Sequence, residues 1–123
     1  MKNKIKEMLD MLIFELENLL EDIRAIEDLQ STKEKNREIS KYVYLENTSL
    51  LKKELSSIQW LIARLSEDEC EEVADISSFS DKVNDYLEHH QSHANMPGAV
   101  HSLVNNKLEK IVKYFSDPDN LID

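Results

Sequence analysis

Hydrophobic residues recur every three or four positions along most of this chain, which is the period of a helix with one buried side. Near the N-terminus they form one continuous stripe that predicts a helix over residues 3–29. The stripe consists of Ile5, Leu9, Leu12, Leu16, Leu19, Ile23 and Ile26. Phe14 falls on the opposite side of this helix, so we expect its ring to be exposed.

The segment QSTKEKNRE interrupts this stripe and contains a helix-start signal. Ser31 followed three residues later by Glu34 matches a capping box, in which each side chain bonds a free backbone N–H at a helix start. This predicts a second helix over residues 31–65, with a possible break near residues 47–49. Its stripe consists of Leu51, Leu55, Ile58, Ile62 and Leu65.

A second capping signature, Ser66 with Glu69, predicts a third helix over residues 66–94. Serines compete with helical hydrogen bonds, so the stretch SSFS predicts a bend or restart near residues 77–80. A fourth helix is expected over residues 97–116, because Asp117-Pro118 cannot continue it. Residues 117–123 should form a frayed tail. The stripe of the fourth helix consists of Val100, Val104, Leu108, Ile111 and Phe115.

The composition supports the same fold class. One glycine and two prolines in 123 residues leave little turn chemistry, which favours a few long helices over a sheet. Short connections between amphipathic helices give antiparallel neighbours. We therefore predict an all-α, antiparallel bundle of about four helices in a single domain spanning residues 1–123. The first two helices should be the longest, and would overhang as a hairpin or meet a second subunit.

Charge is concentrated in one part of the chain. The net charge is −10, and residues 67–99 carry one lysine and nine acidic residues, a local charge of −8. Such a segment repels nucleic-acid phosphates and anionic membrane, and it attracts a basic protein. We therefore expect a basic protein partner and no direct contact with nucleic acid or membrane. A homodimer through the apolar stripes is a further possibility.

The predicted third helix separates its acidic and apolar residues onto opposite sides. Val73, Ile76, Val83 and Leu87 share one side. Carboxylates on the other side form the candidate binding surface: Glu71, Asp75, Asp81, Asp85 and Glu88. Two aromatic residues of the second helix, Trp60 and Tyr42, lie off its stripe and are candidate interface anchors. If that helix buries two sides, however, Trp60 belongs to the core.

All four histidines lie between residues 89 and 101, and three residues there have metal-ligand spacing. Asp85, His89 and His93 are spaced i, i+4, i+8 and would point to one side of a helix as a possible zinc site. The simpler interpretation is a helix end, because histidine suits the negative end of the helix dipole and Asn95, Pro97 and Gly98 suit a turn. We favour the helix end.

A second metal hypothesis uses acidic pairs, as in all-α nucleotide pyrophosphohydrolases that hold magnesium between facing helices. Here Glu17 with Glu21 and Glu72 with Asp75 have suitable spacing, although Glu17 and Asp75 should point away from the apolar stripes. No glycine-rich phosphate loop or Cys-x-x-Cys pair is present. We therefore expect no enzymatic activity and no cofactor, and we retain a metal-binding protein or metal-dependent hydrolase as the alternative.

The expected compartment is the cytoplasm. Cys70 is the only cysteine, so no disulfide can form within the chain, and acidic residues interrupt the apolar part of the N-terminus as they would not in a signal peptide. Together these features predict a small acidic cytoplasmic protein that docks its third helix on a basic partner. Inhibitors of the immunity-protein type, antagonists that imitate DNA charge, and chaperones all belong to this class.

Overall fold

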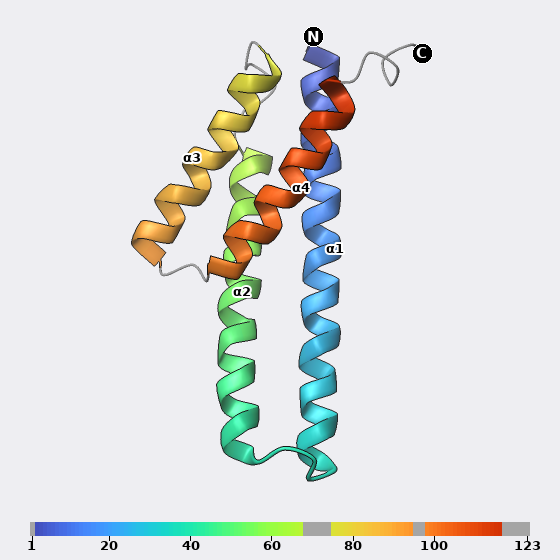
Figure 1. Cartoon of the computed structure of the whole chain (residues 1–123), viewed down its shortest axis with the longest axis vertical. Coiled ribbons are helices and arrows are strands. Elements are labelled where there is room, and N and C mark those ends of the chain that lie inside the picture. The colour runs from blue at the N-terminus through green and yellow to red at the C-terminus, as the bar shows by residue number, and fades with distance from the viewer. Residues whose placement is uncertain (1, 68–74, 95–97, 117–123) are drawn as a thin grey trace.

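The computed structural model describes residues 2–67, 75–94 and 98–116, with side-chain surroundings for residues 4–67, 75–89 and 98–116. Four helices account for nearly all of these residues: α1 (Lys2–Lys35), α2 (Lys41–Glu67), α3 (Ile76–Ala94) and α4 (Gly98–Ser116). No strand occurs in the described ranges. The prediction of an all-α bundle is confirmed (Figure 1).

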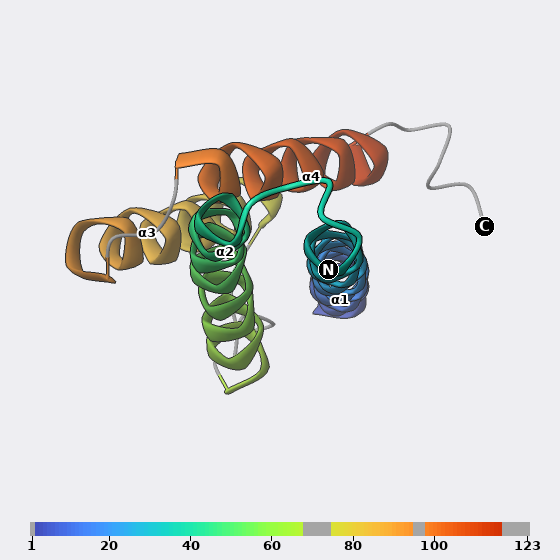
Figure 2. The same ribbon diagram turned by 90° about the horizontal axis from the view of Figure 1, so that it is seen from below.

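The two longest helices, α1 and α2, form an antiparallel hairpin (Figure 1). The other two cover only the part of this hairpin nearer the start of α1 (Figure 1). Seen along the hairpin, α4 crosses over both α1 and α2, and α3 lies beside α4 (Figure 2). The far part of the hairpin therefore extends beyond the bundle, as one of the two sequence-based alternatives predicted.

A single cluster of buried side chains joins all four helices. The helix periodicity places these residues on the facing sides. The stripe of α4 is buried as predicted, and Phe79, Val83 and Leu87 of α3 are fully buried. Three residues of α2, Ile58, Leu61 and Leu65, complete the cluster with seven residues of α1. Those of α1 are Ile5, Met8, Leu9, Leu12, Leu16, Leu20 and Ile23, so two members of the predicted stripe, Leu19 and Ile26, are not fully part of it.

The turn between α1 and α2 lies later in the chain than Ser31 and Glu34 predict. α1 runs to Lys35, and Thr32 is accommodated because its hydroxyl donates to the Asp28 carbonyl at 3.1 Å. At the end of α1 the N–H of Arg37 donates to the Glu34 carbonyl, and the N–H of Glu38 donates to the Lys33 carbonyl. Together with φ 59° at Arg37, this is a Schellman cap.

The residue that starts α2 is Ser40. Its hydroxyl accepts a hydrogen bond from the Val43 N–H at 3.1 Å, the contact expected of an N-cap. The predicted start at Ser31 was wrong, because Ser31 lies inside α1. A capping box is a local signal, and here the adjoining helical turns continued through it.

No break occurs near residues 47–49, where the sequence suggested one. The Thr48 hydroxyl donates to the Tyr44 carbonyl at 2.9 Å within the same helix, so its polar group is satisfied without unwinding. The Asn47 side-chain amide donates to Gln30 of α1 at 2.9 Å and ties the two helices together. α2 therefore continues through this polar stretch.

α3 also begins later than predicted. Ser66 lies in the last turn of α2, since α2 continues to Glu67 beyond the buried Leu65. The first residue of α3 is Ile76, so residues 77–80 form its first turns. Of the two alternatives predicted for residues 77–80, a bend or a restart, the structure agrees with the restart. Phe79 holds this start against the core. Residues 68–74 and the predicted tail, 117–123, lie outside the described residues.

The projecting part of the hairpin, which we call the overhang, comprises residues 24–50. Ile23 is the last residue of α1 in the hydrophobic cluster, and Leu51 is the first residue of α2 packed against it. Six of the ten large hydrophobic side chains exposed in the described residues lie in the overhang. They are Ile26, Leu29, Tyr42, Val43, Leu45 and Leu50.

Candidate functional site

The carboxylates of α3 lie on the side predicted for them. Asp81, Asp85 and Glu88 are exposed, whereas Phe79 and Val83 on the other side are fully buried. Spacings of four and three residues bring the three carboxylates within two turns of one another. With Asp75 they form what we call the acidic face of α3. Glu71, the fifth predicted member, lies outside the described residues.

Asp75 caps the N-terminus of α3 in addition to carrying a charge. Its Oδ1 accepts a hydrogen bond from the Ser78 backbone N–H at 2.8 Å, so it is the N-cap of α3. This bond and, to a lesser extent, a hydrogen bond with the Ser78 side chain hold the pKa of the Asp75 carboxyl below its ordinary value of 3.8. The carboxylate therefore stays charged to a lower pH than an unbonded aspartate does.

A shallow depression of about 530 Å³ lies between the start of α3 and the end of α4. It is lined by Asp75, Ile76, Ser77, Ser80, Asp81, Val112 and Ser116. It lies between the C-terminal end of α4, where a helix dipole is negative, and the N-terminal end of α3, where it is positive, so the two dipoles oppose each other. The depression, which we call the acidic hollow, therefore owes its negative charge to the Asp75 and Asp81 carboxylates, which it combines with apolar and hydroxyl contacts. These properties suit a lysine or arginine side chain.

The two aromatic candidates do not share this surface. Trp60 is half-buried and packs against the hydrophobic cluster, so it lies between the two sequence-based alternatives of core and surface. Tyr42 is 75% exposed at the start of α2, in the overhang and far along the hairpin from α3 (Figure 1). The structure thus separates Tyr42 from the acidic face.

Contacts from α2 help to position α3. The Arg64 guanidinium lies over the Tyr86 ring, 5.2 Å from its centre, as a cation–π contact does. The Tyr86 hydroxyl is buried and has no hydrogen-bond partner in the described part of the chain. These contacts lie on the inner side of α3 and leave its acidic side open.

Within the described residues, the structure does not bring together the ligands of either predicted metal site. Asp85 and His89 are exposed on α3, while the side chain of His93 lies outside the described set. Glu17 and Glu21 are exposed on α1, Asp75 caps α3, and Glu72 is not described. Among the described residues, no group of three or more histidine, cysteine or acidic side chains is placed to hold a metal ion.

A second acidic surface, on α1, was not predicted from the sequence. Glu7, Asp10, Glu17 and Glu21 are exposed on either side of Phe14, which is itself 60% exposed. Their spacing of about three and four residues places them together on the outer side of α1. The signal was hidden because lysines elsewhere on α1 and α2 balance the net charge of the first 66 residues.

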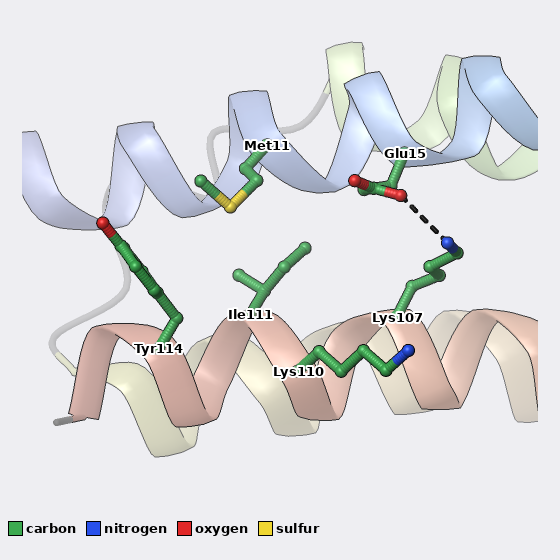
Figure 3. Close-up of a pocket in the computed structure, with 6 residues that line it drawn as sticks. All are labelled: Met11, Glu15, Lys107, Lys110, Ile111 and Tyr114. Carbon is green, nitrogen blue, oxygen red and sulfur yellow. Dashed lines mark ion pairs between the residues drawn. The ribbon is translucent and has the colours of Figure 1, made fainter. Parts of the chain in front are cut away.

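The contact between α1 and α4 contains a smaller hollow of about 280 Å³ (Figure 3). Met11 of α1 and Ile111 of α4 point toward each other across it (Figure 3). At one end, Lys107 Nζ and Glu15 Oε2 form an ion pair at 3.0 Å. This hollow belongs to the interface that holds α4 on the hairpin.

Comparison with protein-family models, with curated proteins and with solved structures finds no significant match. None of the helices in the described ranges combines the length and apolar character of a membrane-spanning segment. The function must therefore be argued from the surface itself.

Proposed function

We propose that this protein works by binding another protein, and that the acidic face of α3 docks on a basic surface of that partner. The observation that carries the proposal is the acidic hollow, where Asp75 and Asp81 lie beside the C-terminal end of α4. A lysine or arginine of the partner enters this hollow, and Asp85 and Glu88 contact neighbouring basic residues.

The physical chemistry favours recognition by charge. The acidic residues are exposed, so their attraction acts at long range and speeds encounter more than it strengthens the final complex. Affinity then depends on contacts such as the one with Ile76, which is half-buried in the hollow. An inhibitor, an antagonist or a chaperone of a basic protein would all use such a surface.

The test compares two variants with the same change in net charge. In the first, the three exposed carboxylates of α3 that are not caps, Asp81, Asp85 and Glu88, are replaced by lysine. In the second, the exposed Asp10, Glu17 and Glu21 of α1 are replaced by lysine. Each variant and the native chain serve as bait for affinity capture from the native host, followed by mass spectrometry.

We expect the α1 variant to retain the same basic protein as the native chain, and the α3 variant to lose it. Both variants should fold, because exposed charges contribute little to stability. Equal losses by the two variants would mean that net charge alone matters. Retention by the α3 variant would show that the partner binds elsewhere.

A further inference from the structure

Two exposed apolar residues of α1 in the overhang lie on the side that α4 covers elsewhere. Ile26 follows Glu15 by 11 residues, which is about three helical turns, and Leu29 follows Met11 by 18 residues, which is five turns. Met11 and Glu15 both line the hollow between α1 and α4 (Figure 3). Ile26 and Leu29 therefore face the same way as these residues, but they lie in the overhang, outside the hydrophobic cluster.

Two exposed apolar residues of α2 face the same side. Leu50 precedes the fully buried Leu61 by 11 residues, and Val43 precedes it by 18. Leu50 also precedes Arg64 by 14 residues, about four turns, and Arg64 contacts Tyr86 of α3. A group of large apolar side chains exposed on one side of a hairpin is typical of a surface that binds another element. We call this group, whose members are between 38% and 51% exposed, the open face: Ile26, Leu29, Val43 and Leu50.

Charged residues of opposite sign mark the two ends of the open face. The hydrogen bond between Gln30 and Asn47 shows which residues of α1 and α2 lie at the same level. Asp22 is eight residues before Gln30 and Glu54 is seven residues after Asn47, so the two carboxylates lie at about the same level, next to the bundle. Lys33, three residues after Gln30, lies nearer the turn of the hairpin. None of the three charged side chains has an ion-pair partner in the described ranges.

The same charged residues lie on the open side of the two helices. Asp22 precedes Ile26 by four residues and Lys33 follows Ile26 by seven, so all three share one side of α1. On α2, Glu54 follows Leu50 by four residues. A helix lying along the open face would therefore meet two carboxylates at one end and an ammonium group at the other.

The open face is too short for a second hairpin of this chain. Between its charged ends it spans about 11 residues of α1, or ~16 Å. In an antiparallel pair in which Ile26 met Leu29 of a second copy, Lys35 of that copy would reach the level of Leu20, where the bundle already covers the hairpin. A single helix of about three or four turns fits the open face without meeting the bundle.

We propose that the open face binds an amphipathic helix of another protein, antiparallel to α1. One side of that helix carries aliphatic residues at spacings of three and four, the contacts that amphipathic helices use when they bind other proteins. Its last turn is basic and lies beside Asp22 and Glu54, and its first turn is acidic and lies beside Lys33. This contact does not involve α3, so it is independent of the proposed function and either proposal can fail alone.

The direction of the bound helix follows from helix dipoles. Acidic residues stabilise the first turn of a helix and basic residues the last, so a helix with these charges is also one that forms readily. In this direction it runs the same way as α4, which begins beside α2 at the inner end of the overhang (Figure 1). The negative C-terminal end of the bound helix then faces the positive N-terminal end of α4.

A synthetic peptide tests the contact. The probe is a fluorescent, lactam-bridged helix of about 14 residues, or four turns, with leucines on one side, glutamates in its first turn and lysines in its last. Fluorescence anisotropy measures its binding to the native chain and to variants. Ile26→Lys should weaken binding at least about tenfold, because it buries a charge in the contact. Leu45→Lys is the matched control: Leu45 is 55% exposed in the overhang but on another side of α2, so this change should leave binding intact.

A neutral peptide, with glutamine in place of the glutamates and lysines, tests the charged ends of the open face. The native chain should bind the charged peptide about three- to tenfold more tightly than the neutral one. In the triple variant Asp22→Asn, Lys33→Gln and Glu54→Gln this preference should disappear, and the comparison cancels any difference in helix content between the peptides. Circular dichroism of each variant reports its own helix content.

Cross-linking tests the direction. A photoreactive group in the last turn of the charged peptide should attach near Asp22, and attachment near Lys33 would contradict the antiparallel arrangement. The proposal is overturned if the charged peptide shows no saturable binding, if Ile26→Lys binds it as the native chain does, or if the triple variant keeps the preference. Self-association of the native chain in sedimentation, abolished by Ile26→Lys and without peptide binding, would show that a second copy covers the open face instead.

Discussion

Ser40 and Ser31 are serines near the same end of the hairpin, and only Ser40 caps a helix. Ser40→Ala removes the acceptor for the Val43 N–H and should lower the free energy of unfolding by about 1 kcal/mol. Ser31→Ala replaces a serine inside α1 by a better helix former and should have no such cost. Thermal and urea unfolding of both variants measures the difference.

Equal destabilisation by the two serine substitutions would contradict the observed helix boundaries.

Arg37 explains part of why the end of α1 was hard to predict. It adopts the left-handed conformation that a glycine usually provides at a helix end, so the sequence carries no glycine to mark the turn.

Glu54 of α2 predicts a pH dependence of stability. Partial burial raises the pKa of its carboxyl above the ordinary 4.5, so the folded state disfavours the charged form. Its contribution to stability is thus greatest below the unfolded pKa and is lost as pH rises through the folded pKa. Glu54→Gln should therefore stabilise the protein at about pH 7 and lose that advantage at about pH 3.

Chemical denaturation at both pH values measures this effect, with Glu17→Gln as the control at an exposed site. A stability gain for Glu54→Gln that is equal at the two pH values would show that ionisation of Glu54 is not its cause.

At the scale of elements, α3 is held in place by Phe79, which lies in the segment where the serines predicted a bend or restart. Phe79 stands among the serines of SSFS and yet is fully buried in the first turns of α3. Phe79→Ala should destabilise the protein by about 3–5 kcal/mol, because it leaves a large cavity in the core. Leu103→Ala, at a 41% exposed leucine of α4, should cost far less.

Urea unfolding measures the effect of both substitutions on stability, and a small effect of Phe79→Ala would mean that α3 is not anchored at its start.

The stripes of α1 and α4 were predictable because apolar spacing records which side is buried. The start of α2 was not, because the Ser31–Glu34 signal competes with helical packing that only the folded chain reveals. For α3 the Ser66–Glu69 signal was misleading in the same way, whereas the restart expected near residues 77–80 lies close to the observed start at Ile76.

At the scale of the whole molecule, the structure separates two surfaces that the sequence could not separate. The apolar stripe of α1 continues to Ile26 in the sequence, but packing against α4 ends before it and leaves Ile26 44% exposed. How far one helix covers another depends on the tertiary arrangement and not on periodicity. Likewise Asp75 and Asp81 were predicted as neighbours on α3, but their position beside Ser116 of α4 required the fold.

The most direct test of the partner contact is the rate of association with the captured basic protein, measured over a range of salt concentrations. For the native chain, we predict a rate that falls steeply as salt rises. Replacing Asp81, Asp85 and Glu88 by lysine should slow association and flatten this dependence, whereas replacing Asp10, Glu17 and Glu21 should leave most of it. A native rate that is insensitive to salt, or equal slopes for the native chain and the α3 variant, would contradict recognition by the acidic face of α3.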